Sequence, residues 1–350
     1  MTLPFLPAKP ALGSLRPMVP GFMPAPSGVA SELAAVTGLD GSVLNMVTAD
    51  HHADSDGCGF YRIDSDECRW FAKVVAATRH PQQVAAERLA EWLARRGMRV
   101  SATLPGFPRD WRRPSGALLH VFAYHYIDAR FAKPSIEDVS ALGALLAALH
   151  LALAVWPGAV AAKRAWDERC GALNRARGKV LSGELSAGPD PERLRALLAE
   201  VPFDVGGRRQ VVHNDFHRAN VLFPNDGTPP VLLDLEDACH SFQPPVIDIA
   251  KALERFILAD AADDRQAFTL GRHFLLTYAA AGGPARLERE QSLFNVMRAQ
   301  SVRALCELTV LTAMGQPTGV EEWHKFLYLL DRAEHWREVL RDLDRFWMEK

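Results

Sequence analysis

Short apolar runs separated by polar turn residues fill the first third of the chain, and they have the pattern of half-buried β-strands. Residues 60–63 and 70–75 are rich in aromatic and β-branched side chains and flank a polar turn at 64–67, which predicts an antiparallel hairpin. The pattern as a whole predicts strands at residues 42–48, 60–63, 70–75, 100 and 118–126.

Helical patterns interrupt these strands and then replace them. A short helix is predicted over residues 28–37. A longer one is predicted from Pro81 to Arg96, because proline is favoured at the first helical position and Gly97 ends the pattern. After about Asp138 the chain is expected to be helical, apart from a hairpin region at 211–235.

The least polar stretch of the chain, residues 141–162, contains no Asp, Glu, Lys or Arg. Its leucines recur at helical spacing, and Pro157-Gly158 breaks it, so a buried core helix is favoured over a membrane span. His150 lies in this stretch, and we interpret it as a packed core histidine rather than a catalytic residue. We expect no membrane partner.

The richest concentration of chemically active side chains lies in residues 211–238. Two apolar runs, 211–212 and 221–223, flank a polar loop, and after the turn at 224–227 a short β-rich run, 231–233, ends at Asp234. Such a hairpin places a carboxylate on the loop and returns an amide and a second carboxylate beside it. Phosphoryl transfer uses this set of groups, a carboxylate for the incoming hydroxyl and hard oxygen ligands for Mg²⁺. The candidate residues are His213, Asp215, His217, Asn220 and Asp234.

Here the chain resembles a known family. His213-Asn214-Asp215, with Asn220 five residues after the aspartate, resembles the H-G-D-x-x-x-x-N catalytic loop of the aminoglycoside phosphotransferase and choline kinase-like enzymes. Residues 234–238 (D-L-E-D-A) resemble their metal-binding segment, and residues 248–250 (D-I-A) resemble their D-L-A motif. Protein kinases follow the same logic with H-R-D and D-F-G.

The resemblance extends over roughly residues 40 to 255 and implies roles for individual residues. Asp215 would be the catalytic carboxylate, Asn220 and Asp234 would bind Mg²⁺, and ATP would donate the phosphate. His213 and Asp248 would support the loop. Elsewhere, Lys73 would contact the phosphates, held by a glutamate of the helix at 81–96. Other expected positions are Glu87 as that glutamate (with Glu91 as the alternative), Gly57 and Gly59 in the phosphate-covering loop, and residues 120–126 at the adenine edge.

The sequence departs from the family pattern around the loop. Asn214 stands where glycine is usual, which is tolerable in a left-handed conformation because asparagine accepts a positive φ better than most residues. The stretch 234–248 is about two residues longer than usual and has Cys239 and Ser241 where glycines are common. These changes bear mainly on the loop around Asp237.

Two other interpretations of the loop remain open. The side chains of His213, Asp215 and His217 would face one way on an extended segment, as in a hydrolytic metal site. That interpretation leaves Asn220 and Asp234 unexplained. A polar turn without chemistry explains any one of these residues, but not the ordered set.

The predicted fold class is α+β, a two-lobed protein kinase-like fold with a small antiparallel sheet lobe and a larger, mostly helical lobe. We expect a Pro-rich arm at residues 1–27, a nucleotide-binding lobe at 28–123, and a catalytic and acceptor-binding lobe at 124–350. The arm has no clean apolar core, so we interpret it as a tail rather than a signal peptide.

Composition narrows the classes of function. The chain has 350 residues, 48% hydrophobic and 23% charged, and its formal net charge of −2 without basic blocks argues against a nucleic-acid partner. Its five cysteines are scattered and odd in number, which favours a reducing cytoplasm over a disulfide or zinc framework. No feature of the sequence specifies an oligomeric state.

Three classes of function fit these features. An ATP-dependent kinase acting on a hydroxyl group of a small molecule, such as an aminoglycoside, amino alcohol or sugar, is favoured. A protein Ser/Thr kinase of the bacterial stress-response type is the alternative, and a catalytically silent nucleotide-binding scaffold is the third. The nearly balanced charge of residues 251–350 does not select a polycationic acceptor.

Overall fold

The structure, a computed structural model, describes residues 22–24, 27–38, 43–47, 58–64, 69–186, 188–288, 290–316 and 318–349. Most of the expected Pro-rich arm therefore lies outside the described residues. The chain divides into two compact units. The sheet unit comprises the described residues up to Arg130 together with Leu222–Glu236, and the helical unit comprises those of Phe131–Val221 and Asp237–Lys350. This division differs from the expected one after residue 123.

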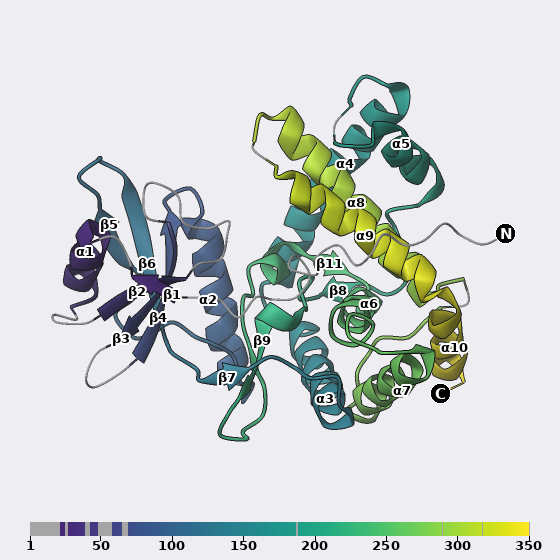
Figure 1. Cartoon of the computed structure of the whole chain (residues 1–350), viewed down its shortest axis with the longest axis horizontal. Helices are drawn as coiled ribbons and strands as arrows, with labels where there is room; N and C mark the ends of the chain where they lie inside the picture. Colours follow the sequence, from purple (N-terminus) through teal and green to yellow (C-terminus); the bar gives the residue numbers. More distant parts are fainter. Residues whose placement is uncertain are drawn as a thin grey trace. The chain divides into compact units, whose positions relative to one another are not determined.

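The sheet unit is built on an antiparallel sheet with the strand order β1-β2-β3-β4-β6-β5 (Figure 1). The predicted hairpin is confirmed, since β3 pairs with β4 in antiparallel register. Because β6 pairs with both β4 and β5, the segment expected at the adenine edge is largely an interior strand. The bounds are β1 (Phe22–Pro24), β2 (Val43–Val47), β3 (Gly59–Asp64), β4 (Arg69–Ala76), β5 (Arg109–Arg112) and β6 (Leu118–His125).

Helices cover both faces of this sheet (Figure 1). On one face, Leu33 of α1 (Ser27–Thr37) packs in a buried cluster with Ala72 and Val74 of β4. On the other face, Val84 of α2 (His80–Ala94) packs in a cluster that includes Phe71 and Val75. Side chains alternate between the faces of a strand, so Lys73 lies on the same face as Phe71 and Val75, as the sequence predicted.

A second, small sheet completes the sheet unit, with strand order β10-β9-β7. Its strands are β7 (Ala129–Arg130), β9 (Val221–Pro224) and β10 (Val231–Leu232). Leu232 donates its N–H to the Arg99 carbonyl and accepts from the Ser101 N–H, both at 2.9 Å. These bonds, beside the isolated parallel bridge of Val100 to Leu232, attach the segment that leads to Asp234 to the sheet unit.

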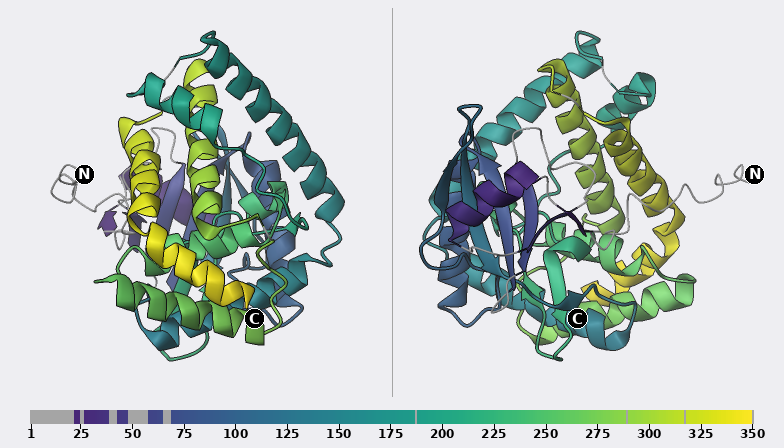
Figure 2. Two further views of the ribbon diagram at one scale, coloured as in Figure 1. Left: turned by 90° about the vertical axis from the view of Figure 1, so that its right-hand side faces the viewer. Right: turned by 60° about the vertical axis from the view of Figure 1, so that its left-hand side comes forward.

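The helical unit consists of packed helices and one small strand pair (Figures 1 and 2). Helix α3 packs along α7, α8 packs along α9, and β8 (Gln210–Val211) pairs with β11 (Phe242–Gln243). The helices are α3 (Ile136–Leu153), α4 (Ala159–Ser182), α5 (Pro191–Glu200), α6 (Val246–Ala252), α7 (Asp264–Ala280), α8 (Leu293–Ala313), α9 (Val320–His335) and α10 (Arg337–Met348). Shorter elements are η2 (Arg218–Asn220), η3 (Asp237–His240) and η4 (Leu253–Ile257), the last of π type.

Helix α3 contains residues 141–153 of the apolar stretch 141–162 that was predicted to be a core helix. Within the described residues it is the one helix long and apolar enough to cross a membrane, and half of Ile136–Leu153 is buried inside the protein. A Cβ added at Gly143 would lie 2.5 Å from the Phe274 carbonyl oxygen, so α3 and α7 approach as closely as glycine permits. This contact accounts for a glycine in the middle of an apolar helix.

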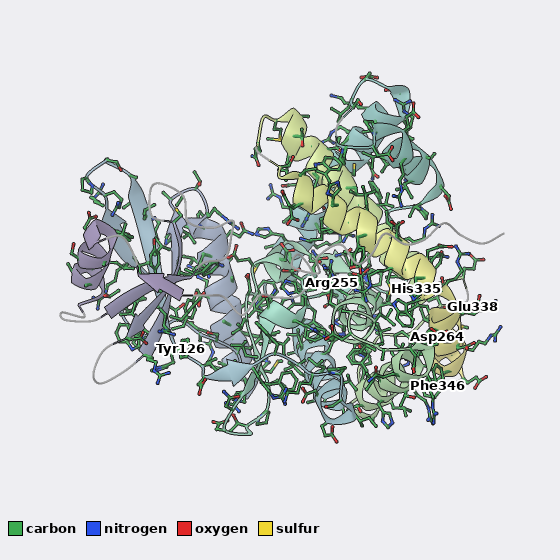
Figure 3. The ribbon with its side chains drawn as sticks, viewed as in Figure 1. Tyr126, Arg255, Asp264, His335, Glu338 and Phe346 are labelled. Atoms are coloured by element: carbon green, nitrogen blue, oxygen red, sulfur yellow. The ribbon has the colours of Figure 1, made fainter. Side chains whose placement is uncertain are left out.

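Helix α10 is strongly amphipathic. It buries Leu340 and Leu343 while Glu338, labelled in Figure 3, is exposed. Asp344 is also buried, and its carboxylate accepts the N–H of Leu293 at the start of α8 at 3.0 Å. Burial raises the pKa of this carboxyl to about 7, since a single hydrogen bond does not replace its hydration.

Candidate active site

The predicted catalytic loop follows β8 of the helical unit and leads to β9. Asp215 lies at the centre of this loop. His217 Nε2 lies 3.1 Å from Asp215 Oδ2. The Asn220 amide donates to the same oxygen at 3.1 Å and to the Asp215 carbonyl at 2.9 Å. Lys251 Nζ lies 3.9 Å from Asp215 Oδ1. The structure thus brings Asp215 and Asn220 together as predicted, and adds His217 and Lys251 to them.

The surroundings of Asp215 favour its ionised form. Burial by itself would raise the pKa of this carboxyl, but the hydrogen bond and charge of His217, together with Lys251 and His213, hold the pKa well below its usual value. The side chain is still 42% exposed, so a substrate hydroxyl can reach it. Asp215 is therefore an anionic, accessible hydrogen-bond acceptor.

The backbone of the loop is held by Asp248, a predicted supporting residue on α6. Its carboxylate, fully buried, accepts the N–H of His213 at 2.7 Å and the N–H of Asn214 at 2.8 Å. His150 Nε2 lies 3.1 Å from the same carboxylate, and its Nδ1 lies 2.8 Å from the Tyr278 hydroxyl. Because the Asp248 carboxylate can only accept, Nε2 of His150 is the donor in this contact. Sequence reasoning left His150 out, yet it supports the loop through Asp248.

Asn214 has φ of 63°, which is the left-handed conformation in which an asparagine is tolerated in place of glycine. The side chain of Asn214 is held in addition to its backbone. Asn214 Oδ1 accepts from Gln243 Nε2 at 2.7 Å, and Asn214 Nδ2 donates to Asp237 Oδ2 at 3.2 Å. Buried Arg303 donates to Gln243 Oε1 and lies 3.5 Å from Asn214 Oδ1. An asparagine side chain thus adds contacts that a glycine could not make.

The longer stretch after Asp234 folds into η3 and β11. Ser241 is fully buried and accepts from Gln243 Nε2 at 2.9 Å, and β11 places Gln243 next to β8. This segment therefore supplies Gln243, the residue that holds the Asn214 side chain. The sequence did not show this contact.

The two residues implied as Mg²⁺ ligands both offer hard oxygen atoms. The Asn220 amide nitrogen is used by Asp215, which leaves its Oδ1 as the atom available to a cation. Asp234, in the sheet unit, is 41% exposed and has φ of 50°, a second left-handed residue that is not glycine. Carboxylate and amide oxygens are ligands that Mg²⁺ accepts, so this donor set fits the ion.

Lys73 in the sheet unit is paired, but not with the predicted residue. Its Nζ donates to Glu236 Oε1 and lies 3.9 Å from Asp234 Oδ1. Arg79 Nη2 lies 3.2 Å from the other oxygen of Glu236. The side chains of Lys73 and Glu236 are only 13% and 9% exposed. Sequence reasoning missed Glu236 as the partner, although it lies two residues after Asp234 in the same motif.

The expected ion pair between Lys73 and Glu87 does not form in this structure. The Glu87 carboxylate instead accepts from the Tyr124 hydroxyl at 2.6 Å, from Gln83 Nε2 at 2.7 Å and from the Thr103 N–H at 3.1 Å. Burial, followed by the charge of Glu87, raises the pKa of the Tyr124 hydroxyl, which therefore stays protonated and donates. Four local donors, counting the Thr103 hydroxyl, satisfy Glu87 where it lies.

Of the two glycines expected to cover phosphates, Gly57 lies outside the described residues. Gly59 begins β3 and pairs with Val74, directly beside Lys73. The neighbouring Phe60 pairs with Lys73 across the strands, and its ring centroid lies 5.8 Å from Lys73 Nζ. Gly59 therefore lies next to the lysine that it was predicted to accompany.

The interpretation as a hydrolytic metal site gains no support. His213 Nδ1 accepts the N–H of Asp215 at 3.2 Å, so this ring is used within the loop. In the part of the chain that the structure describes, no three His, Cys, Asp or Glu side chains are placed to hold a metal ion.

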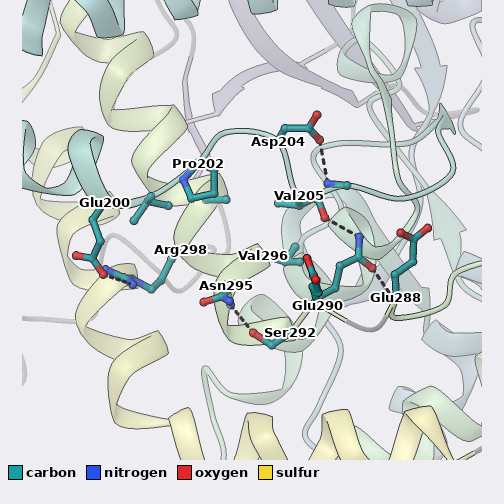
Figure 4. Close-up of a pocket in the computed structure, with 14 residues that line it drawn as sticks. Glu200, Pro202, Asp204, Val205, Glu288, Glu290, Ser292, Asn295, Val296 and Arg298 are labelled. Atoms are coloured by element: carbon teal, nitrogen blue, oxygen red, sulfur yellow. Dashed lines mark hydrogen bonds and ion pairs between the residues drawn. The ribbon is translucent and has the colours of Figure 1, made fainter.

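A cavity of about 660 Å³ lies in the helical unit, between the segment after α5 and the start of α8 (Figure 4). Its wall includes the ion pair of Glu200 with Arg298, at 2.9 Å. None of the predicted site residues lines it. The lining residues include Glu200, Pro202, Asp204, Val205, Glu288, Glu290, Ser292, Asn295 and Arg298.

Comparison with known proteins agrees with this geometry. The model of the phosphotransferase enzyme family matches residues 51–290 of the 350. The chain belongs to this family, and both the predicted family and the predicted class of enzyme, a phosphotransferase, are confirmed. A search of curated proteins found no match.

Solved structures of low identity share the fold. A choline kinase, LicA, from Streptococcus pneumoniae has 13% identity and a TM-score of 0.56, over 88% of this chain and 100% of that one. The amicoumacin kinase hAmiN, in complex with AMP-PNP, Ca²⁺ and Ami, has 14% identity and a TM-score of 0.51, over 81% and 86%. A putative aminoglycoside phosphotransferase from Ralstonia eutropha has 12% identity and a TM-score of 0.50, over 92% and 99%. The predicted fold class is confirmed.

Proposed function

We propose that this enzyme transfers the γ-phosphate of ATP to a hydroxyl group of a small molecule. The observation that carries the proposal is the state of Asp215, an ionised and accessible carboxylate on a loop whose backbone is fixed by a buried carboxylate. Such a carboxylate accepts a hydrogen bond from an alcohol and aims its oxygen at phosphorus.

The chemistry balances with the groups present. The alcohol oxygen forms a bond to the γ-phosphorus while the bond from that phosphorus to the β–γ bridging oxygen breaks, and ADP leaves. Asp215 orients the hydroxyl and receives its proton as the new bond forms. His217 and Asn220 hold the carboxylate in one orientation through Oδ2, which leaves Oδ1 for the alcohol.

Lys73, Asp234 and Asn220 would serve the nucleotide. Lys73 is a partly buried cation that would contact phosphate oxygens in place of Glu236. Asn220 Oδ1 and the Asp234 carboxylate would hold Mg²⁺, which when bound neutralises charge on the phosphates. The nucleotide analogue and divalent ion in the amicoumacin kinase complex support ATP and a divalent cation as requirements here.

Two further features belong to the proposal. A small-molecule acceptor is supported by the names of the similar structures, a choline kinase and an amicoumacin kinase. A reducing, cytoplasmic location is supported by the five cysteines of the sequence, which are scattered, odd in number and without a C-x-x-C motif.

A phosphate-transfer screen tests the function. The purified enzyme with Mg²⁺ and ATP labelled at the γ-position would be incubated with amino alcohols, sugars, aminoglycosides and a protein substrate, and Asp215→Asn is the matched control. We expect label on one class of small hydroxyl compound, and none with Asp215→Asn. Label only on protein, or no label on any acceptor tested, would contradict the proposal.

A further inference from the structure

Helix α6 presents two side chains of opposite charge to the catalytic loop. Asp248 and Lys251 are three residues apart on this helix and therefore lie on one face of it. Asp248 Oδ1 accepts the N–H of Asn214 at 2.8 Å, and Lys251 Nζ donates to the Asn214 carbonyl. Both backbone polar groups of Asn214 are thus held by α6.

Asn214 is a position where such support is needed. Its φ of 63° is uncommon for a residue other than glycine, and holding it costs about 1 kcal/mol or more. The carbonyl that Lys251 contacts belongs to the peptide joining Asn214 to Asp215. A rotation of that peptide would swing the Asp215 side chain away from its place.

The Lys251 side chain is less exposed than expected for a lysine that serves only solubility. Its side chain is 17% exposed, and its contacts are the Asn214 carbonyl and, at 3.9 Å, Asp215 Oδ1. Burial lowers the pKa of the Lys251 ammonium and the charge of Asp215 raises it. Placing a cation here costs free energy because the ammonium loses part of its hydration, which an apolar side chain of similar length would not. A lysine at this position is therefore expected to have a specific role.

We propose that Lys251 is a positioning residue for phosphoryl transfer, which fixes the Asn214–Asp215 peptide and thereby the direction of the Asp215 carboxylate. The inference rests on the proposed function of Asp215. It assigns to Lys251 an effect on turnover rather than on nucleotide affinity, because both the hydrogen bond and the ion pair of Lys251 are made to the loop.

Three variants test this role in the full-length protein. Lys251→Met removes the ammonium and keeps the length of the side chain, and Lys251→Arg restores a cationic donor. Lys325→Met is the matched control, since Lys325 pairs with Glu322 at 2.7 Å on α9 and is 25% exposed. Lys251→Met should lower kcat by about 10- to 100-fold, the size expected of a misplaced reacting group, with KM for ATP within about threefold. Lys251→Arg should recover kcat to within about fivefold, and Lys325→Met should change neither constant.

Hydrogen–deuterium exchange tests the contact without reference to activity. Peptides covering residues 213–217 should exchange faster in Lys251→Met than in the wild type, and at the wild-type rate in Lys325→Met. An unchanged kcat, or a raised KM with unchanged kcat, would overturn the inference and leave the proposed function intact. If the wild type transfers no phosphate, the proposed function is wrong. The exchange measurement then still tests the contact: an exchange rate of residues 213–217 that is the same in Lys251→Met and in the wild type would show that Lys251 does not hold the loop. If Lys251→Met does not fold, Lys251→Gln takes its place with the same expected results.

Discussion

The catalytic loop of the helical unit and the lysine cluster of the sheet unit hold their functional groups in different ways. In the predicted catalytic loop, the buried Asp248 carboxylate accepts two backbone N–H groups, those of His213 and Asn214. In the cluster, Lys73 reaches its carboxylates with a long side chain, and it contacts Glu236 instead of the predicted Glu87.

The difference shows which kind of contact a motif can predict. Hydrogen bonds to backbone groups depend on the local conformation of the chain. The spacing of residues in a motif specifies that conformation. The partner of a flexible side chain depends on which carboxylates lie within its reach and which of them are already satisfied by other donors. Glu87 has four donors of its own, whereas Glu236 has Lys73 and the exposed Arg79.

The largest expected effect separates the chemistry of the loop from nucleotide binding. Asp215→Asn should lower turnover by at least about 10²-fold, the scale of a positioned acid–base group, and leave ATP affinity within a few-fold. Steady-state kinetics and calorimetry measure the two quantities on the same preparation. Retained turnover would mean that another carboxylate is catalytic, with Glu236 and Asp237 to be tested next.

The next effect concerns Asp234, the proposed Mg²⁺ ligand of the sheet unit. Asp234→Asn should largely abolish Mg²⁺-dependent ATP binding measured by calorimetry, because the amide lacks the charge that holds the ion. Asp226→Asn, in an exposed turn of the same unit, is the control and should bind as the wild type does. Unchanged Mg·ATP affinity in folded Asp234→Asn would contradict the assignment.

A smaller effect compares Glu236 with Glu87 as partners of Lys73. Double-mutant cycles with Lys73→Ala, Glu236→Gln and Glu87→Gln would be measured by urea unfolding without nucleotide. The Lys73–Glu236 coupling should be about 1 to 3 kcal/mol and the Lys73–Glu87 coupling close to zero. The reverse result would show that the family pair forms in the free enzyme.

The same cycles measured in kcat/KM sharpen the comparison. If Lys73 moves to the phosphates during turnover, its coupling to Glu236 should be weaker in kcat/KM than in unfolding. Coupling to Glu87 that appears in kcat/KM alone would show that the family pair forms only when nucleotide is bound. Equal couplings to Glu236 in both measurements would mean that Lys73 does not leave it.

The smallest effect is a pH dependence of folding stability caused by Asp344. This residue is remote in sequence from the predicted catalytic residues. Its pKa is raised from 3.8 to about 7, so the folded state binds the proton more tightly than the unfolded chain does. The resulting stability is complete below about pH 3.8 and is lost as the pH rises to about 7. Asp344→Asn, which stays neutral, should raise Tm at pH 8 by roughly 2 to 6 °C and change it little near pH 4.

Asp342→Asn on the exposed face of α10 is the control for this measurement and should not alter the pH profile. A Tm difference between Asp344→Asn and the wild type that is the same at both pH values would show that Asp344 does not titrate in this range.

Much of the fold was predictable because it depends on local patterns. The hairpin of β3 and β4, the start of α2 near Pro81 and the buried helix α3 follow from strand alternation, helix capping and leucine spacing. The edge strand β5 was missed, since only Trp111 of its four residues is buried and the run carries no periodic signal.

The candidate site was predictable in its identities and less so in its contacts. Asp215, Asn220 and Asp234 stand at spacings typical of the family, and Asn214 has the left-handed backbone in which an asparagine can replace the usual glycine. Glu236 and Lys251 were missed as partners. Both lie close to motif residues in the sequence, so the signal was present, but charged residues near a motif are usually solvated.

The sequence by itself determined the family, the main strands of the sheet unit, the helical character of the rest of the chain and the candidate residues for phosphoryl transfer, because these depend on residue type and spacing along the chain. The tertiary structure alone decided that Glu236 rather than Glu87 contacts Lys73, that Gln243 and Arg303 hold the Asn214 side chain, and that Lys251 lies beside Asp215. Each of these contacts joins residues far apart in the chain or residues with several partners to choose from. Their pairing is set by distance and by competition among buried polar groups, which the order of residues does not reveal.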